Sequence, residues 1–353
     1  MTATTTPLRV LVVDDSAYIR KVVKEMLSRS PSLEVVGTAR DSEEALDLVE
    51  RLKPDVVTCD LIMPRSDGVD FITKQMAINP IPIVVVSISA ESSEQVLNAL
   101  DAGAVDFVQK PTALATEKIF EIAEDLVAKV RAAAGASVVR LRPAAPAADA
   151  VAASGAAAPA TFRNRYDVLV IGVSTGGPHG LRMLIPRLAA DFPVPVAIVL
   201  HMPIGYTAAY AKRLDEASAL TVVEAREGDQ VRPGVVFVAP AGRHLTFNRD
   251  AAGAVRIRLD ISPLDTAHRP SVDVLFQSAA EVYGDRVLAV VMTGMGDDGR
   301  QGAAWIKARG GAVLTEAEES CVVYGMPRAV VEAGLSDASV PLERLSEAIM
   351  ERI

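Results

Sequence analysis

Short runs of valine, isoleucine and leucine alternate with amphipathic segments throughout residues 9–130. In the amphipathic segments apolar residues recur every three or four positions, which is typical of a helix with one buried face. The apolar runs are nearly continuous, and strands of that kind are buried on both faces by helices. Five such strand and helix pairs follow one another. This part of the chain is therefore predicted to form a five-stranded parallel α/β sheet.

The same alternation opens the second half of the chain, over residues 167–225, and it resumes from residue 272. Between these segments, residues 226–260 contain short β-branched runs separated by glycine, proline and aspartate, which favour turns. This stretch is predicted to form antiparallel hairpins, inserted in or appended to a parallel sheet. The second half is thus expected to be a larger, doubly wound and mostly parallel α/β domain with an antiparallel hairpin region.

A segment of different composition separates the two patterns. Residues 131–161 are rich in alanine, contain almost no large apolar side chain and are interrupted by prolines and glycines. Such a segment cannot build a core of its own and favours a semi-flexible tether. We therefore expect a first domain at residues 7–130, an alanine- and proline-rich linker at 131–161, and a second domain at 162–353.

The length and composition of the chain argue against several classes of protein. The chain has 353 residues, enough for two domains at roughly 100 to 200 residues each. Its 36 Lys and Arg are outnumbered by 45 Asp and Glu, and the net charge of -9 argues against a broad basic surface for nucleic acid. Cys59 and Cys321 supply neither a disulfide framework nor a thiol metal site. Because no apolar run approaches the roughly 18 residues of a membrane span, a cytoplasmic protein without membrane insertion is predicted.

Three carboxylates of the first domain fall where predicted strands end. Asp14 and Asp15 follow the first strand, and Asp60 follows the third. The carboxyl ends of parallel strands lie at one edge of the sheet, and carboxylates brought together there require a counter-ion. The sequence therefore predicts a site for Mg²⁺, in which Asp60 could receive a phosphoryl group. Ser87 and Lys110, at the ends of the fourth and fifth strands, would contact that group and offset its charge.

For any one of these aspartates taken alone, a turn or helix-cap role is the better interpretation, but the whole constellation resembles a response-regulator receiver domain over residues 9–130. That resemblance implies the flavodoxin-like five-stranded fold. It also implies that a histidine kinase phosphorylates Asp60 and that Ser87 and Lys110 sense the phosphoryl group. The implied Mg²⁺ ligands are Asp14, Asp15, Asp60 and the backbone carbonyl of Ile62.

In the second domain a strand runs into Gly172, Ser174 and Gly176, which satisfy G-x-S-x-G. This pattern is typical of a strand-to-helix turn that exposes a nucleophilic serine hydroxyl. It is short, and an ordinary helix start with Ser174 or Thr175 near the N-cap is an equally good interpretation of the motif alone. A dinucleotide-binding loop is disfavoured because Ser174 occupies the place of the second glycine.

A serine nucleophile needs a base and an acid that orients the base. His201 follows the next predicted strand and should lie beside Ser174 at the same edge of the sheet. A further strand ends in a glycine-rich loop at residues 294–299, where Asp297 or Asp298 could hold the imidazole. Backbone N–H groups near Met295 could bind an oxyanion. The order Ser, His, Asp differs from that of the α/β-hydrolases, which argues against that fold.

These motifs closely resemble the catalytic domain of the chemotaxis-receptor methylesterases (CheB), across residues 167–338. The matching segments are GVSTGGP, LHMPIGYTAAYAKRLD, VAPAGRHL, HRPSVDVLFQSAA, MTGMGDDGRQGA and CVVYGMPRA. The resemblance implies that Ser174 is the nucleophile, His201 the base and then the acid, and Asp298 the orienting acid, with Met295 in the oxyanion hole. Thr175 and His268 match residues that line the site, although a structural role for His268 is about equally expected. His179 and His244 are expected to be surface or turn residues.

The family implies a phosphorylation-activated hydrolase that removes methyl esters from chemoreceptor glutamates and deamidates receptor glutamines. Its expected partners are chemoreceptors and a histidine kinase. We expect a monomer whose hydrolase site needs no cofactor, and whose receiver moves off the catalytic face when Asp60 is phosphorylated. The alternatives are a phosphorylation-gated binding module without catalysis and a DNA-binding regulator. The acidic charge and the large α/β second domain disfavour the DNA-binding regulator.

Overall fold

Two units make up the chain in this computed structural model, at residues 1–143 and 144–353, and each is considered by itself. The structure describes residues 6–63, 66–87, 93–110, 117–136, 138–141 and 165–353.

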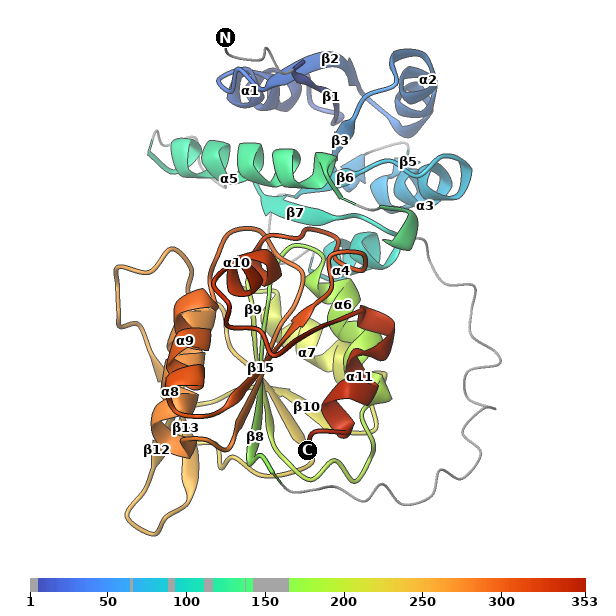
Figure 1. The fold of residues 1–353 in the computed structure, drawn as a ribbon. Coiled ribbons are helices and arrows are strands. Elements are labelled where there is room, and N and C mark those ends of the chain that lie inside the picture. Colours follow the sequence, from blue (N-terminus) through green and yellow to red (C-terminus); the bar gives the residue numbers. More distant parts are fainter. Residues whose placement is uncertain (1–5, 64–65, 88–92, 111–116, 137, 142–164) are drawn as a thin grey trace, which may run out of the picture. The chain divides into compact units, whose positions relative to one another are not determined.

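Five strands of the first unit form one parallel sheet in the order β2-β1-β3-β6-β7 (Figure 1). They are β1 (Leu8–Val13), β2 (Leu33–Ala39), β3 (Val56–Cys59), β6 (Ile83–Ser87) and β7 (Asp106–Gln109). Every residue of β3 and β6 is buried, as strands covered on both faces require. A short antiparallel pair, β4 (Ile62–Met63) and β5 (Ser66–Asp67), follows β3. The predicted five-stranded parallel sheet is confirmed.

The helices of this unit are α1 (Ala17–Leu27), α2 (Ser42–Leu52), α3 (Gly68–Ile78), α4 (Ser93–Asp101) and α5 (Glu117–Ala134). Ser16 caps the first turn of α1 and Asp41 that of α2, each by accepting a backbone N–H. Helix α5 extends past residue 130, the predicted end of the first domain. A 3-10 turn follows it at Val138–Leu141, with Val138 and Leu141 buried. The remainder of the predicted linker, residues 142–161, lies outside the described residues.

The second unit contains a seven-stranded parallel sheet in the order β10-β11-β9-β8-β14-β15-β16. Its strands are β8 (Val168–Val173), β9 (Val196–Leu200), β10 (Thr221–Glu224), β11 (Val235–Val238), β14 (Val287–Val291), β15 (Ala312–Glu316) and β16 (Ala338–Val340). Strands β12 (His244–Arg249) and β13 (Val255–Asp260) form a separate antiparallel hairpin. The predicted doubly wound domain with a hairpin region is confirmed. The prediction of antiparallel hairpins is wrong for β11, which lies within residues 226–260 but pairs in parallel with β9 and β10.

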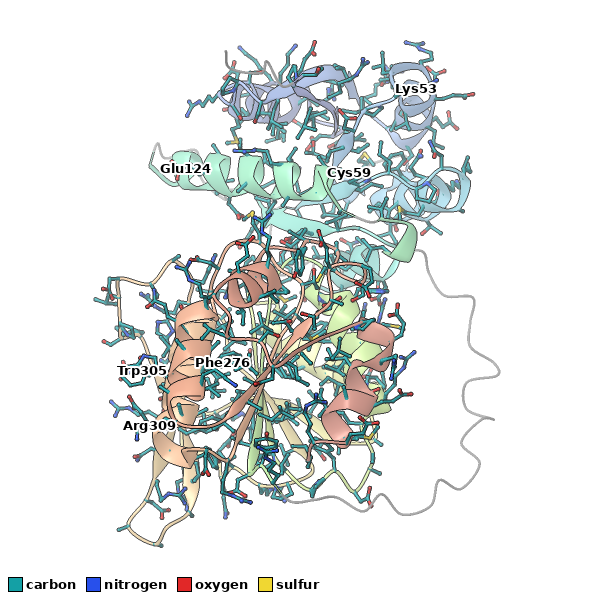
Figure 2. The ribbon with its side chains drawn as sticks, in the orientation of Figure 1. Lys53, Cys59, Glu124, Phe276, Trp305 and Arg309 are labelled. Carbon is teal, nitrogen blue, oxygen red and sulfur yellow. The ribbon has the colours of Figure 1, made fainter. Side chains whose placement is uncertain are left out.

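Helices cover both faces of the larger sheet. They are α6 (Gly177–Leu184), α7 (Thr207–Glu216), α8 (Val272–Tyr283), α9 (Arg300–Ala308), α10 (Met326–Glu332) and α11 (Leu342–Met350), with a 3-10 turn at Ile185–Arg187. Helices α8 and α9 and the hairpin lie on one side of the sheet, and α6 and α11 on the other (Figure 1). Figure 2 shows Phe276 of α8 turned into the core and Trp305 on the outer side of α9.

The order of the strands reverses direction at β8. The chain proceeds from β8 to β9 on one side, whereas β14 occupies the other side. Ligands of open α/β sheets bind beyond the carboxyl ends of strands at such a reversal. Among the described residues, no helix is long and apolar enough to cross a membrane.

Candidate active site

Ser174 occupies a tight turn between β8 and α6. Its N–H donates to the carbonyl of Thr293 at 3.0 Å, and its own carbonyl accepts the N–H of Gly177 at 2.7 Å. Gly176 has a φ of +80°, a left-handed conformation that glycine adopts without steric cost. Gly294 approaches so closely that a Cβ there would lie 2.8 Å from the Cβ of Ser174. The backbone therefore holds the serine at the sheet edge from two sides.

His201 lies directly beside this turn. Strands β8 and β9 pair with Val173 opposite Leu200, so Ser174 and His201 are the next residues on adjacent strands. The His201 N–H donates to the Val173 carbonyl at 3.1 Å. Its side chain is only 7% exposed, and its Nε2 lies 2.9 Å from Oδ2 of Asp298.

The hydrogen bond to Asp298 defines which nitrogen of His201 can act as a base. An ionised carboxylate only accepts hydrogen bonds, so Nε2 carries the proton of the neutral ring and Nδ1 carries the lone pair. Nδ1 is buried, and no described residue forms a hydrogen bond with it. Nδ1 is therefore the atom available to take a proton from a neighbouring hydroxyl.

The beginning of helix α8 fixes the carboxylate of Asp298. Oδ2 accepts the N–H of Val272 at 2.8 Å, and Oδ1 accepts the N–H of Asp273 at 2.9 Å and the hydroxyl of Ser271 at 3.0 Å. Burial alone would raise the pKa of Asp298. The hydrogen bond and charge of His201, together with these N–H groups, outweigh burial and hold the pKa well below its ordinary value. The group is thus a carboxylate at neutral pH.

Asp273, in the first turn of α8, accepts backbone N–H groups at the start of the neighbouring helix α9. Its Oδ1 accepts the N–H groups of Gly299 and Gly302, at 2.9 and 2.7 Å, at the start of α9. Backbone N–H groups at the start of α9 are therefore bound by an acid of α8, and those at the start of α8 by an acid of the loop that leads into α9. Asp297 lies outside this arrangement, since its exposed carboxylate pairs with Arg300 at 2.8 Å. Of the two adjacent acids, the structure thus brings only Asp298 to His201.

Replacing Asp273 with Asn is expected to stabilise the second unit at neutral pH. Burial raises the pKa of Asp273 from 3.8 to about 6, aided by the charge of Asp298, although the N–H of Gly302 opposes the shift. A raised pKa means that the protonated form stabilises the fold below about pH 4 and that this contribution is lost as the pH rises through 6. Asn keeps the acceptor for both glycines without the buried charge. We expect D273N to gain about 1 kcal/mol at pH 7.5 and almost nothing at pH 4.

Urea unfolding at both pH values, followed by the fluorescence of Trp305, the one tryptophan of the chain, measures this difference. Asp297→Asn is the matched control, because that carboxylate is exposed. A D273N protein that is less stable than the wild type at pH 7.5, and not at pH 4, would contradict the interpretation.

The other predicted site residues surround the pair. His268, although exposed, stacks its ring on that of His201, with centroids 4.1 Å apart and planes inclined by 24°. Thr175, the residue after Ser174, is buried. Two N–H groups, of Gly325 and Met326, hold the carbonyl of Gly294, and the N–H of Met295 has no acceptor among the described residues. An N–H left free in this way can donate to an oxyanion.

The expectation that His244 is a surface or turn residue is wrong. His244 is fully buried in β12, where Nε2 donates to the Pro263 carbonyl at 3.1 Å and Nδ1 accepts the Ser271 N–H at 3.2 Å. Burial lowers its pKa. It therefore holds the residue that caps α8 and contacts Asp298. In the segment HLTF, His244 alternates with Leu245 and shares a strand face with Thr246, so the sequence pattern gave no signal of its burial. His179 is half-buried within α6.

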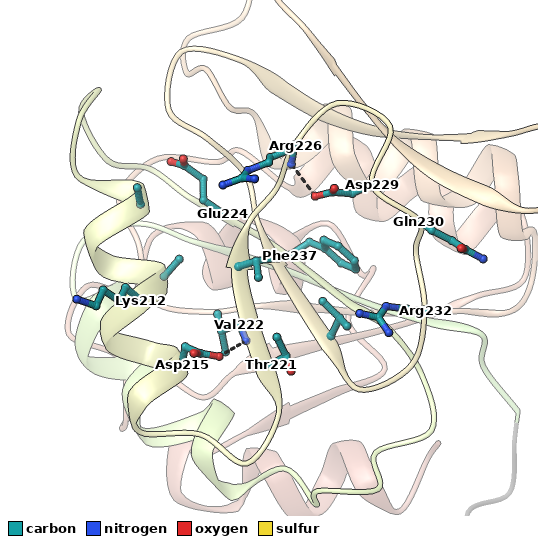
Figure 3. Close-up of a pocket in the computed structure, with 14 residues that line it drawn as sticks. Lys212, Asp215, Thr221, Val222, Glu224, Arg226, Asp229, Gln230, Arg232 and Phe237 are labelled. Carbon is teal, nitrogen blue, oxygen red and sulfur yellow. Dashed lines mark hydrogen bonds between the residues drawn. The ribbon is translucent and has the colours of Figure 1, made fainter.

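Two hollows are associated with the second unit. One of about 570 Å³ lies beside Asp298 and is lined by His268, Asp273 and Trp305. The other, of about 590 Å³, lies at the edge of the sheet between α7, β10 and β11 (Figure 3). None of the predicted site residues lines the second hollow. Of these two hollows, only the one beside Asp298 is lined by predicted site residues, namely His268 and Asp298.

The predicted acidic pocket is present in the first unit. Oxygens of Asp14, Asp15 and Asp60 lie within 4.8 Å of one another. Lys110 Nζ lies 2.5 Å from Asp14 and 2.8 Å from Asp60, and all three of these side chains are buried. Burial raises the pKa of Asp14, and the charge of Asp60 adds to the shift, although Lys110 opposes it. Three carboxylates with one ammonium carry excess negative charge, which suits a hard divalent cation.

Ser87 and Ile62 lie at the margins of this pocket. Ser87 is fully buried at the end of β6, and its carbonyl accepts the Lys110 N–H at 2.5 Å. Ile62 follows two residues after Asp60 and has a half-exposed side chain. Both therefore share the strand-end edge of the sheet with the three acids.

Comparisons with known proteins cover nearly the entire chain. The family models described as CheB methylesterase and as response regulator receiver domain match residues 169–349 and 10–123. Protein-glutamate methylesterase/protein-glutamine glutaminase 5 of Myxococcus xanthus is 52% identical over 96% of this chain and 95% of its own length. A protein of that name from Symbiobacterium thermophilum is 45% identical over 98% and 97%. The Thermotoga maritima CheB methylesterase catalytic domain aligns with a TM-score of 0.52 and 44% identity, over 53% of this chain and 99% of that domain.

Proposed function

The chain belongs to the receiver-linked CheB methylesterase family, and we propose that it is a phosphorylation-activated serine hydrolase acting on glutamate methyl esters of chemoreceptors. The observation that carries this proposal is the pairing of His201 with Asp298 directly beside Ser174 at adjacent strand ends. The same site would deamidate receptor glutamines, because an ester and a primary amide of glutamate share one acyl carbon.

The chemistry would proceed in two halves. Ser174 Oγ attacks the glutamyl carbonyl carbon while His201 Nδ1 takes the hydroxyl proton and Asp298 stabilises the imidazolium. The carbonyl oxygen becomes an oxyanion, for which the Met295 N–H is the donor. Collapse breaks the bond to the leaving group, and His201 returns the proton to give methanol or ammonia. Water, deprotonated by His201, then attacks the acyl-serine and releases glutamate and the free serine.

A burst of product from an activated acyl ester tests this proposal against a binding module without catalysis. The burst is expected to equal one equivalent of protein, because the acyl-serine forms faster than it hydrolyses. A wild-type protein that shows no burst and acquires no acyl group on Ser174 would favour the binding module.

We propose that the first unit, a receiver domain, controls this activity through Asp60. Asp60 would accept a phosphoryl group from a histidine kinase, and Ser87 and Lys110 would contact its oxygens. The carboxylates of Asp14, Asp15 and Asp60, with the carbonyl of Ile62, would hold Mg²⁺. Bound Mg²⁺ supplies charge neutralisation for the phosphoryl group. The linker at residues 131–161 would join this domain to the hydrolase in a cytoplasmic, monomeric protein.

Asp60→Asn is expected to abolish activation by a small phosphodonor. The amide cannot form the acyl phosphate, so the ratio of ester hydrolysis with and without phosphodonor should fall to about 1 in the variant. Chelation of Mg²⁺ should have the same effect on the wild type. Asp47→Asn, on the exposed face of α2, is the control and should keep the wild-type ratio. Persistent activation of the Asp60 variant would place the phosphoacceptor elsewhere.

A further inference from the structure

One acidic side chain of the second unit takes no part in the proposed chemistry and is nevertheless fully buried. Glu316 ends β15 and has no exposed surface. Glutamate is almost never buried to this extent unless its oxygens are satisfied. Both oxygens of Glu316 are satisfied: Oε2 accepts the N–H of Thr293 at 2.9 Å, and Oε1 accepts the hydroxyl of Ser320 at 3.1 Å.

Thr293 connects this carboxyl group to the nucleophile turn. Its carbonyl accepts the Ser174 N–H at 3.0 Å, and its hydroxyl donates to the Thr175 carbonyl at 3.0 Å. Met295, whose N–H is the candidate oxyanion donor, follows two residues later. A shift of the Thr293 backbone would therefore change the position of the oxyanion donor relative to the nucleophile.

We propose that Glu316 is a positioning residue of the hydrolase site. By accepting the Thr293 N–H, it fixes residues 293–295 against Ser174, so that the hydroxyl and the Met295 N–H keep the separation that the reaction needs. What matters in this role is an acceptor atom at the position of Oε2. Without that acceptor, the Thr293 N–H is buried unsatisfied, and the peptide must move to find another partner.

Two variants of Glu316 separate the reach of the side chain from its charge. Glu316→Gln keeps the reach: its carbonyl oxygen accepts the Thr293 N–H, and its amide donates to Ser320. The Ser320 hydroxyl can then turn to the Ala317 carbonyl, 3.1 Å away. Glu316→Asp keeps the charge but is shorter by one methylene, about 1.5 Å. Its carboxylate therefore cannot reach Thr293 without moving the strand.

We expect kcat for methyl-ester hydrolysis to fall about 10- to 100-fold in E316D, because displacements near 1 Å at a reacting centre have effects of this size. E316Q should keep at least half of the wild-type kcat. KM should stay unchanged in both variants, since Glu316 does not line the hollow beside Asp298. The rate at which a fluorophosphonate labels Ser174 in the full chain should follow kcat. Glu319→Asp and Glu319→Gln, on the exposed turn after β15, are the matched controls.

Wild-type labelling in E316D, equal losses in E316Q and E316D, or a loss confined to KM would each overturn the proposal. Trp305 fluorescence during thermal unfolding shows whether each variant is folded, and if E316D is not, a large loss of kcat in folded E316Q still overturns the proposal. The role of Glu316 rests on the proposed hydrolase function, but the labelling rate needs no receptor. Wild-type protein that is labelled without releasing methanol would therefore count against the proposed substrate and leave the test of Glu316 intact.

Discussion

Replacing Ser174 with Ala should reduce methyl-ester hydrolysis by about 10⁴-fold or more, which is the usual consequence of removing a serine nucleophile. The substitution removes one oxygen from a half-exposed position and leaves the backbone bonds of Ser174 to Thr293 and Gly177 in place. We therefore expect KM and thermal stability to remain close to those of the wild type.

The measurement is methanol release by the full chain at saturating ester. Ser218→Ala is the matched control, since Ser218 lies at the end of α7 and its hydroxyl donates to the Leu214 carbonyl. That variant should stay within about twofold of the wild type, in line with substitutions remote from a site. More than about 1% residual activity in S174A would contradict the assignment of the nucleophile.

Asp298→Asn should have the second-largest effect, a fall in kcat of about 10⁴-fold. An amide can donate to Nε2 of His201, which stabilises the tautomer with the proton on Nδ1. Nδ1 then has no lone pair and cannot take the proton of Ser174. The amide nitrogen also cannot accept the N–H and hydroxyl groups that converge on Asp298 from α8. We expect this variant to lose about 1 to 2 kcal/mol of stability as well.

Nitrogen NMR of labelled histidine distinguishes the two tautomers of His201 directly. In the wild type, at a pH where the ring is neutral, Nε2 should be protonated and Nδ1 bare, and D298N should reverse the pattern. Asp297→Asn is the matched control, because that neighbouring acid pairs with Arg300 instead. A wild-type ring protonated on Nδ1, or an equal loss of kcat in D297N, would be incompatible with the proposed geometry.

The parallel strands and the residues at their ends could be predicted from sequence for a simple physical reason. Strands buried on both faces are nearly continuous in valine and isoleucine, and adjacent parallel strands end at one edge. Ser174 and His201 follow consecutive strands of this kind, and Asp14 and Asp60 follow the first and third strands of the first unit. Periodicity therefore places these side chains at a common sheet edge, whereas their roles rest on the motifs that resemble known families.

What depends on pairing between distant segments could not be predicted in this way. Strand β11 lies among turn residues like those of a hairpin, and only its pairing with β9 and β10 makes it part of the main sheet. Asp297 and Asp298 are adjacent in one loop, and the start of α8 selects the second. The burial of His244 follows from the packing of the β12 hairpin. Thr293 and Glu316 follow or end consecutive strands, so their proximity could be expected, but not that the Glu316 side chain turns inward to accept the Thr293 N–H.

The most direct test of the whole account is methanol release from receptor membranes that carry methylated glutamates, with and without a small phosphodonor and Mg²⁺. The account predicts that the full chain releases methanol, that the phosphodonor accelerates the release, and that D60N loses the acceleration. Absence of methanol release by the phosphorylated wild type, or a rate that phosphodonor leaves unchanged, would contradict a phosphorylation-activated receptor methylesterase.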